Sequence, residues 1–334
     1  MQKIRIINGT YKIRGKDVDL AGMVFPLVEG FKWGTKGSYI TVDAKDIAGF
    51  PDRNIKIMVP DEDSFEKVDS ATKVTKREET DEEVIDRMRE RFDMLEDMTK
   101  AAKKGTVRAM IVSGPPGVGK SLGFEKVLGK HDLIATLGEK APKYEVVKGA
   151  MSAIGLYCKL FNYADKDNVL VFDDCDSVLL DDLSLNILKA ALDSKKSRRI
   201  HWNTDSFKLR NEGVPDSFEF KGSAIFITNI KFDNVKSKKM RDHLEALESR
   251  CHYIDLTIDT EREKMLRIKQ IVRDGMLTEY MFSGDVVQDI IDFVDINKAR
   301  LRELSLRTVL KVADLAKAFP DRWEAMAENT VMKR

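Results

Sequence analysis

Cysteine is scarce in this sequence, and the few cysteines present are isolated from one another. The 334 residues include Cys158, Cys175 and Cys251 but no C-x-x-C pair, and no signal-peptide pattern precedes them. Structural disulfides form in oxidising compartments, whereas isolated thiols suit a reducing one. We therefore expect a cytoplasmic protein.

The sequence also lacks long hydrophobic runs and an excess of charge of either sign. The longest apolar run near the N-terminus, Leu20 to Leu27, is too short to span a bilayer and contains Pro26. Lysine and arginine number 57 against 56 aspartates and glutamates, which gives a net charge of +1. This balance argues against a basic nucleic-acid coat or an acidic tail, so any charged binding surface must be local. We expect no membrane partner.

The most informative motif is a glycine-rich segment between a predicted strand and a predicted helix. Gly114-Pro-Pro-Gly117-Val-Gly119-Lys120-Ser121 matches the phosphate-binding pattern G-x-x-x-x-G-K-[ST] at every position. Glycines let successive backbone N–H groups turn inward around a polyphosphate, and the following helix directs its positive end at the same anion. Lys120 would reach the β- and γ-phosphates, and Ser121 would hold Mg²⁺. The predicted nucleotide-binding residues are Gly114, Pro115, Pro116, Gly117, Val118, Gly119, Lys120, Ser121 and Leu122.

Two carboxylates follow a second buried strand about fifty residues later. Val169-Leu-Val-Phe172 leads directly into Asp173 and Asp174, and ligands of open α/β sheets bind at such strand ends. Asp173 is placed to organise Mg²⁺, directly or through water, and Asp174 to orient or deprotonate the attacking water. Acidic residues at this place also occur as simple loop caps. Asn229, at the end of Ala224–Thr228, is a further candidate for the water or the γ-phosphate, although asparagine at a strand end is often only a turn residue.

The order of the predicted elements divides the chain into four parts, and we find no internal repeats or low-complexity segments. Residues 1–60 form a β-rich module, in which Asn8-Gly9 between alternating apolar residues predicts a hairpin. Residues 61–79 are polar and predict a linker. Thr80 and Glu83 form a capping-box pair before a helix that begins the α/β part, residues 80–258. Residues 259–334 have helical periodicity only.

These elements, in this order, resemble the AAA+ ATPases, a family of oligomeric motor and switch proteins. The resemblance covers about Thr80 to Ala316 and leaves out the N-terminal module. It implies a P-loop NTPase fold, with a parallel sheet covered by helices on both faces, a small α-helical lid domain after it and here a small β-rich module before it. It also implies ATP and Mg²⁺ as cofactors and a homo-oligomer, a hexameric ring.

The resemblance also assigns roles to residues beyond the phosphate loop. The family's first sensor falls on Asn229, and its arginine finger falls on Arg250, which would reach the γ-phosphate of a neighbouring subunit. A helix C-terminal arginine favoured by the helix dipole is the alternative for Arg250. The second sensor falls on Arg307, with Arg302 as the competing position. Together with Asp174, Asn229 and Arg250 complete the predicted catalytic set.

The chain departs from the family at one catalytic position. The family has Asp-Glu where this sequence has Asp173-Asp174, so the second carboxylate is one methylene shorter. A displacement of about 1 Å can lower a rate on the order of 10²-fold. Either hydrolysis is normal because the strand lies closer to the phosphate, or the protein is a slow ATPase that acts as a switch. Paired aspartates are also similar to the viral superfamily-three helicases, although the helical lid region with Arg307 fits the AAA+ family better.

A long segment before the strand that carries Asn229 is the candidate for partner binding. Residues 195–221 contain two strand-like pieces, Arg199–Trp202 and Ser217–Phe220, with basic residues interleaved with Trp202 and Phe207. This mixture can pair phosphates and stack bases of single-stranded nucleic acid, but it also suits a solvated loop or a subunit interface. The loop of residues 149–155 lacks the aromatic residue of protein-threading relatives, which weakly disfavours an unfoldase.

The leading hypothesis is a ring-forming AAA+ ATPase that remodels a macromolecular partner, possible nucleic-acid roles being those of a helicase or helicase loader in DNA replication. A protein-remodelling ATPase is the rival within this class. The other class is a slow ATP-dependent switch or scaffold, in which residues 1–60 recruit an unknown protein partner.

Overall fold

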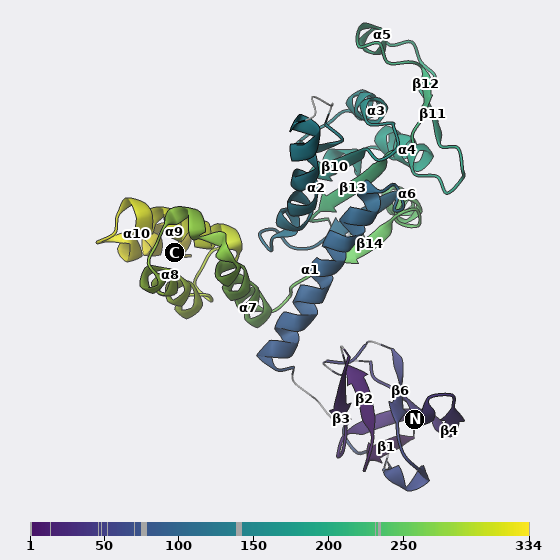
Figure 1. Ribbon diagram of the computed structural model, residues 1–334, viewed down its shortest axis with the longest axis vertical. Coiled ribbons are helices and arrows are strands. Elements are labelled where there is room, and N and C mark those ends of the chain that lie inside the picture. Colours follow the sequence, from purple (N-terminus) through teal and green to yellow (C-terminus); the bar gives the residue numbers. More distant parts are fainter. Residues whose placement is uncertain are drawn as a thin grey trace. The chain divides into compact units, whose positions relative to one another are not determined.

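The computed structural model describes residues 2–333 except 14, 46, 48, 52, 70, 75–78, 138–141, 231, 233 and 234, and except the side chains of 130–137. The chain separates into two compact units, Met1–Val84 and Ile85–Arg334. Figure 1 shows a small unit built of strands and a larger one that contains both a sheet and helices. Each unit is described separately below.

The first unit is a single antiparallel sheet in the order β3-β2-β6-β5-β4-β1-β7. Side chains that alternate along the strands meet in one core, with Ile4, Phe25, Ile40 and Ile57 fully buried. The predicted β-rich module is therefore present. Its strands are β1 (Lys3–Ile6), β2 (Thr10–Ile13), β3 (Lys16–Asp19), β4 (Val24–Gly34), β5 (Gly37–Asp43), β6 (Asn54–Met58) and β7 (Phe65–Val68).

The hairpin predicted at Asn8-Gly9 is wrong. β1 pairs with β4 and β7, whereas β2 pairs with β3 and β6, so the chain crosses between strands instead of turning back on itself. Gly9 is needed for a different reason: a Cβ there would lie 3.0 Å from Ile6 and 3.1 Å from Ile57 side-chain atoms. Glycine is needed here so that neighbouring side chains can pack closely, because it has no Cβ. The Asn-Gly sequence has the pattern of a hairpin turn and gives no sign of this packing.

Part of the predicted linker is also structured. Within residues 61–79, a 3₁₀ helix (Glu62–Ser64) leads into β7, which pairs with β1 at the sheet edge. The prediction of a linker missed β7 because this strand lies at the edge of the sheet, where a strand can be short and polar. Residues 75–78 of that segment lie outside the described residues, and the predicted domain boundaries remain predictions.

The second unit contains the predicted parallel sheet, in the order β14-β8-β13-β10-β9. All four strand pairs are parallel. One face packs its buried Ile111, Phe172 and Phe226 against helices, and the strands are buried on the other face too, as near-continuous apolar runs predict. The strands are β8 (Ala109–Ser113), β9 (Tyr144–Lys148), β10 (Val169–Asp173), β13 (Ser223–Thr228) and β14 (His252–Asp255).

Helices cover both faces of this sheet, as expected. The predicted capping box is present at the start of the first helix, where Glu83 N–H donates to Thr80 Oγ1 at 3.3 Å and Thr80 N–H to Glu83 Oε2 at 3.1 Å. Figure 1 shows α2 running from the phosphate loop alongside the sheet. The helices are α1 (Asp81–Lys103), α2 (Lys120–Leu137), α3 (Ala153–Asn162), α4 (Asp182–Ala191) and α6 (Lys238–Glu248).

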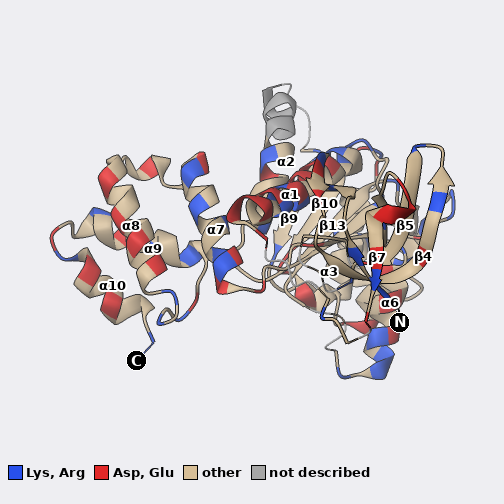
Figure 2. Ribbon diagram, turned by 90° about the horizontal axis from the view of Figure 1, so that it is seen from below, with Lys and Arg blue, Asp and Glu red and all other residues tan. Residues whose placement is uncertain are grey.

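The C-terminal part of this unit is helical, as predicted for a lid. Its helices share a core that includes Ile290, Val294, Val309 and Val312. Both basic and acidic residues occur along the helices of this part (Figure 2). The helices are α7 (Glu261–Ile271), α8 (Gly284–Ile296), α9 (Leu306–Ala318) and α10 (Trp323–Val331), with a π-helical turn at Val272–Met276.

The segment of residues 195–221 forms an insertion between α4 and β13. Its two predicted strands are present as β11 (Arg199–His201) and β12 (Ser217–Glu219), an antiparallel pair that carries α5 (Phe207–Asn211) between its strands. At the base, buried Arg198 donates to Ala191 O at 3.2 Å and to Gly222 O at 3.1 Å. In the part of the chain that the structure describes, we find no helix with the length and apolarity that crossing a membrane requires.

Candidate nucleotide-binding site

The phosphate loop lies between the end of β8 and the start of α2. Gly117 and Gly119 adopt φ values of 70° and 92°, in the left-handed region that favours glycine. A Cβ on Gly114 would lie 3.0 Å from Leu256 O, and one on Gly117 would lie 2.7 Å from Ser305 Cβ. Glycine is therefore required in this loop both for positive φ values and for close packing against neighbouring residues.

Lys120 holds this loop together from its inner side. Its Nζ donates to Gly114 O at 2.6 Å and to Asn229 Oδ1 at 2.5 Å, and the residue is only 7% exposed. Burial lowers the pKa of the ammonium group, while Asp174 and Asp173 oppose that shift. The lysine is thus a buried cation whose neighbours include the two carboxylates that the sequence singled out.

Ser121 and Asp173, the pair predicted to hold Mg²⁺, are hydrogen-bonded to each other. Ser121 Oγ donates to Asp173 Oδ2 at 3.1 Å, so both oxygens face the same small space at the start of α2. Among the described residues, no group of three or more His, Cys, Asp or Glu side chains is arranged to hold a metal ion on its own. Mg²⁺ does not need one, because it takes few protein ligands and completes its shell with water and phosphate oxygens. The residues present therefore fit this metal.

Asp174 and Asn229 lie together beyond the ends of neighbouring strands. Asn229 Nδ2 donates to Asp174 Oδ1 at 2.9 Å, which links the amide to an exposed carboxylate. Asp174 adopts φ = 52°, a left-handed conformation that aspartate tolerates better than most residues. This backbone geometry gives a physical reason for aspartate where the resembling family has glutamate.

Arg250 lies away from these residues, at the end of α6. It follows the C-cap of α6, donates back to Ala246 O of that helix and to Ser249 Oγ at 3.5 Å, and its Nε is buried without a hydrogen-bond partner among the described residues. In the single chain Arg250 therefore occupies the helix C-terminal position that was its alternative interpretation. Next to it, burial raises the pKa of Cys251 to about 12.

Of the two arginines considered for the second sensor, Arg302 and Arg307, Arg307 is the one near the phosphate loop. Leu306 N–H donates to Gly117 O at 3.0 Å, which places the start of α9 against the loop, and the charge of Arg307 acts on the pKa of Lys120. Arg302 instead donates to Met332 O at 2.9 Å, near the C-terminus. The geometry thus separates the two positions that the sequence left open.

Arg267 was missed by the sequence analysis. It is buried on α7, lies with its guanidinium 3.5 Å from the ring centroid of Phe92 and donates to Val118 O at 3.4 Å. Burial lowers its pKa to about 10. A cavity of about 690 Å³ lies beside it, between α1, the start of α2 and α7. The sequence around Arg267 has no motif that distinguishes it from other basic residues on helices, so its burial beside the cavity could not be predicted.

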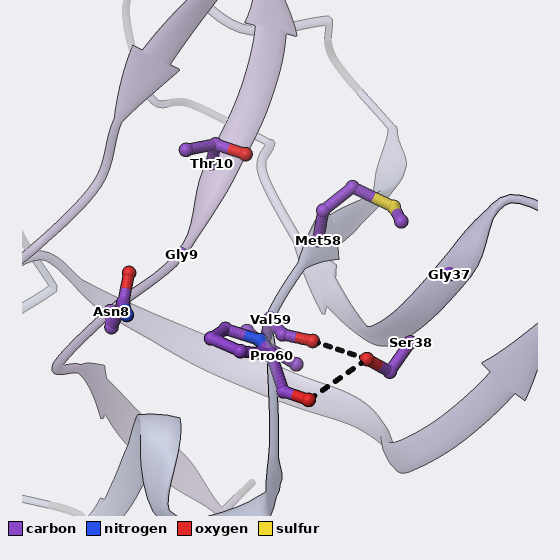
Figure 3. Close-up of a pocket in the computed structure, with 8 residues that line it drawn as sticks. All are labelled: Asn8, Gly9, Thr10, Gly37, Ser38, Met58, Val59 and Pro60. Carbon is purple, nitrogen blue, oxygen red and sulfur yellow. Dashed lines mark hydrogen bonds between the residues drawn. The ribbon is translucent and has the colours of Figure 1, made fainter.

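A second hollow, of about 260 Å³, lies in the N-terminal unit (Figure 3). Ser38 Oγ donates there to Val59 O at 2.6 Å and to Pro60 O at 3.2 Å. None of the residues that line it is titratable: they are Asn8, Gly9, Thr10, Gly37, Ser38, Met58, Val59 and Pro60. This hollow therefore offers no titratable side chain for catalysis.

The phosphate loop, the parallel strand order, the two carboxylates at the end of β10 and the following helical domain define the class: the chain has a P-loop NTPase fold. It belongs to the family of a protein of Enterobacteria phage T4, described as an uncharacterized 36.7 kDa protein in the nrdC–mobD intergenic region. The two are 35% identical over 258 residues, which are 76% of this chain and 78% of the phage protein. No family model matches the sequence.

Two solved structures are similar to parts of the chain. The Thermotoga maritima RuvB Holliday junction branch migration motor covers 73% of this chain and 68% of its own, at 14% identity and a TM-score of 0.40. The replication initiator DnaA, bound to AMPPCP and single-stranded DNA, covers 70% of this chain, at 12% identity and a TM-score of 0.37. This chain spans 63% of that DnaA chain.

Proposed function

We propose that this protein binds and hydrolyses ATP in a ring-type homo-oligomer, a hexamer, and couples this to the remodelling of a macromolecular partner. The observation that carries the proposal is one continuous arrangement: Lys120 bonds to Asn229, and Asn229 bonds to Asp174, at the mouth of a phosphate loop. The loop supplies an anion site, and Asp174 supplies a base or an orienting acceptor next to it.

Each residue has a distinct part in this proposal. Loop N–H groups and Lys120 bind the polyphosphate, and Asp174 orients the attacking water, with Asn229 fixing its carboxylate. Ser121 and Asp173 would hold Mg²⁺, which when bound neutralises charge on the phosphate oxygens. Arg307 would approach the phosphates from the start of α9. The cavity beside Arg267 would take the base.

Arg250 would act on the nucleotide of the neighbouring subunit. Its side-chain hydrogen bonds to Ala246 O and Ser249 Oγ both use Nη1, and its Nε has no partner among the described residues, so most of its donors are available to a new acceptor. Exchange of a helix carbonyl for a phosphate would make turnover depend on assembly.

The favoured partner is single-stranded nucleic acid, as for a helicase or helicase loader. The insertion presents Phe207, which is 72% exposed, next to Lys208 on α5, a combination that stacks bases and attracts phosphates. Lys208 and Arg210 also pair with acidic neighbours on the insertion, so a protein surface is the rival partner. The second candidate function is a slow ATP-dependent switch in the cytoplasm that recruits a protein through residues 1–60. Slow hydrolysis would follow from the side chain of Asp174, which is one methylene shorter than that of glutamate.

The test is ATP turnover against protein concentration, with and without single-stranded DNA, for the wild type beside Asp174→Asn. A rate per subunit that rises with concentration and with DNA, and vanishes in the variant, supports the ring motor. Negligible turnover that ignores DNA and the variant, while nucleotide still binds, favours the switch. Lys120→Ala should abolish binding; binding that survives it would overturn the site itself.

A further inference from the structure

The carboxylate assigned to Mg²⁺ already has a cation beside it. Lys148 Nζ lies 3.3 Å from Asp173 Oδ2, the same oxygen that accepts the hydrogen bond from Ser121 Oγ. The sheet dictates this contact, because Lys148 ends β9, Asp173 ends β10, and the two are register partners in adjacent parallel strands. The lysine side chain is 61% exposed and the aspartate side chain 8%. A flexible amine thus reaches from solvent onto a buried carboxylate.

A second carboxylate lies within reach of the same amine. Lys148 Nζ is 3.9 Å from Glu125 Oε1, and Glu125 is 48% exposed on α2, four residues after Ser121. The ammonium group therefore lies between a buried acid at the metal position and an exposed acid one helical turn away. Small rotations of a four-carbon side chain suffice to favour one acid or the other.

Mg²⁺ and the ammonium group cannot share Asp173 Oδ2 without cost. Both are positive, and at separations of a few ångströms in a partly buried site like charges repel strongly. Without metal, however, three carboxylates, Asp173, Asp174 and Asp176, act on the one buried cation Lys120, so a second cation beside Asp173 is favourable. Lys148 supplies that cation and must give way when the metal arrives.

We infer that Lys148 is a positioning residue that holds the Asp173 carboxylate before Mg²⁺ binds and then moves to Glu125. This inference rests on the proposed function, since it concerns the same site. It makes part of the affinity for Mg²⁺ depend on an exchange of partners by one lysine. Lys148 opposes the metal, and Glu125 assists it by receiving the displaced charge.

The experiment measures how much Mg²⁺ tightens nucleotide binding. The full-length protein is titrated with a fluorescent ATP analogue that carries a methylanthraniloyl group on the ribose, once in EDTA and once in saturating Mg²⁺. The ratio of the two dissociation constants is the metal-linked gain. We expect Lys148→Met to raise this gain roughly three- to tenfold, because the metal no longer displaces an ammonium group. Lys159→Met, which removes a partner of Glu145 on the same strand β9, is the control and should leave it unchanged.

A second variant, at Glu125, should change the metal-linked gain in the direction opposite to Lys148→Met. Glu125→Gln should lower the metal-linked gain, because the displaced lysine loses its acceptor, and it should have no effect in the Lys148→Met background. An effect that persists there would mean that Glu125 attracts Mg²⁺ by its own charge, and would overturn the exchange. An unchanged or smaller gain in Lys148→Met overturns the inference alone. Failure of the wild type to bind the analogue in either buffer would overturn the proposed function and this inference with it.

Discussion

Asn229 Nδ2 donates a hydrogen bond of 2.9 Å to Asp174 Oδ1, and so joins the end of β13 to the carboxylate that follows β10. The other end of the amide accepts from Lys120. An amide that donates on one side and accepts on the other can serve a cation and an anion at once, which neither a carboxylate nor an ammonium group can do. The orientation of Asp174 is thereby tied to Lys120, the residue that we propose to bind the phosphates.

Replacement of this amide should separate catalysis from binding. We expect Asn229→Ala to lower ATP turnover on the order of 10²-fold, because Asp174 loses the donor that fixes it, while nucleotide affinity falls by less. Turnover assays and binding titrations on the same preparation measure both effects. Asn186→Ala, an exposed asparagine on α4, is the control. A loss confined to affinity would show that Asn229 serves Lys120 instead.

The arginine finger is best tested by mixing subunits. Arg250→Ala should keep nucleotide binding and lose roughly 10³-fold or more in turnover. Asp174→Asn should lose turnover for a different reason, so a mixture of the two variants should recover part of the rate at sites that combine an intact Asp174 with a neighbour's intact Arg250. Arg241→Ala, on the same helix α6, should behave as the wild type. Absence of recovery in mixed oligomers would contradict action in trans.

Two glycines make a matched test of the contact between lid and phosphate loop. Gly117→Ala places a methyl group 2.7 Å from Ser305 Cβ at a φ of 70°, so we expect the free energy of unfolding to fall by about 1–3 kcal/mol. Gly129→Ala on α2 meets open space and should raise it by about 0.5–1 kcal/mol. Chemical denaturation without nucleotide measures both. Equal effects would show that the Ser305 contact is not maintained in solution.

Alkaline pH should destabilise the protein through Cys251. Burial raises the pKa of this thiol to about 12 from an ordinary value of 9.0. Above pH 9 the unfolded chain loses the proton that the folded chain keeps, so its contribution to stability is complete below pH 9 and is lost as pH rises towards 12. The slope attributable to one such thiol rises from about half of 1.4 kcal/mol per pH unit at pH 9 towards that limit as pH increases. We expect Cys251→Ala to decline less steeply than the wild type in denaturation series between pH 9 and 10; parallel curves would refute the assignment.

The sequence predicted the α/β core well because its signals are local and agree with one another. The apolar runs that form β8, β10 and β13 each end in a polar residue, and parallel strands bring such ends to one edge. Lys120, Asp173, Asp174 and Asn229 therefore meet as their spacing suggests. Their catalytic roles remain predictions.

The remaining features depend on contacts that no local pattern encodes. Asn8-Gly9 has the composition of a hairpin, yet Gly9 is required by the close approach of Ile6 and Ile57. Lys148 reaches Asp173 only because the register of β9 and β10 makes them partners. In the sequence Arg267 is an ordinary basic residue of an amphipathic helix, and its contact with Phe92 of α1 is seen only in the structure. In each case the decisive neighbour comes from a separate element.

Arg198 gives the insertion a closed base, and this has a consequence for divergence within the family. Its guanidinium bridges the carbonyls of Ala191, at the end of α4, and Gly222, just before β13. Arg198 thus connects the two ends of the insertion, next to α4 and β13, at the residue before β11 begins. Changes of length or sequence beyond this bridge should therefore leave β13 and Asn229 in place.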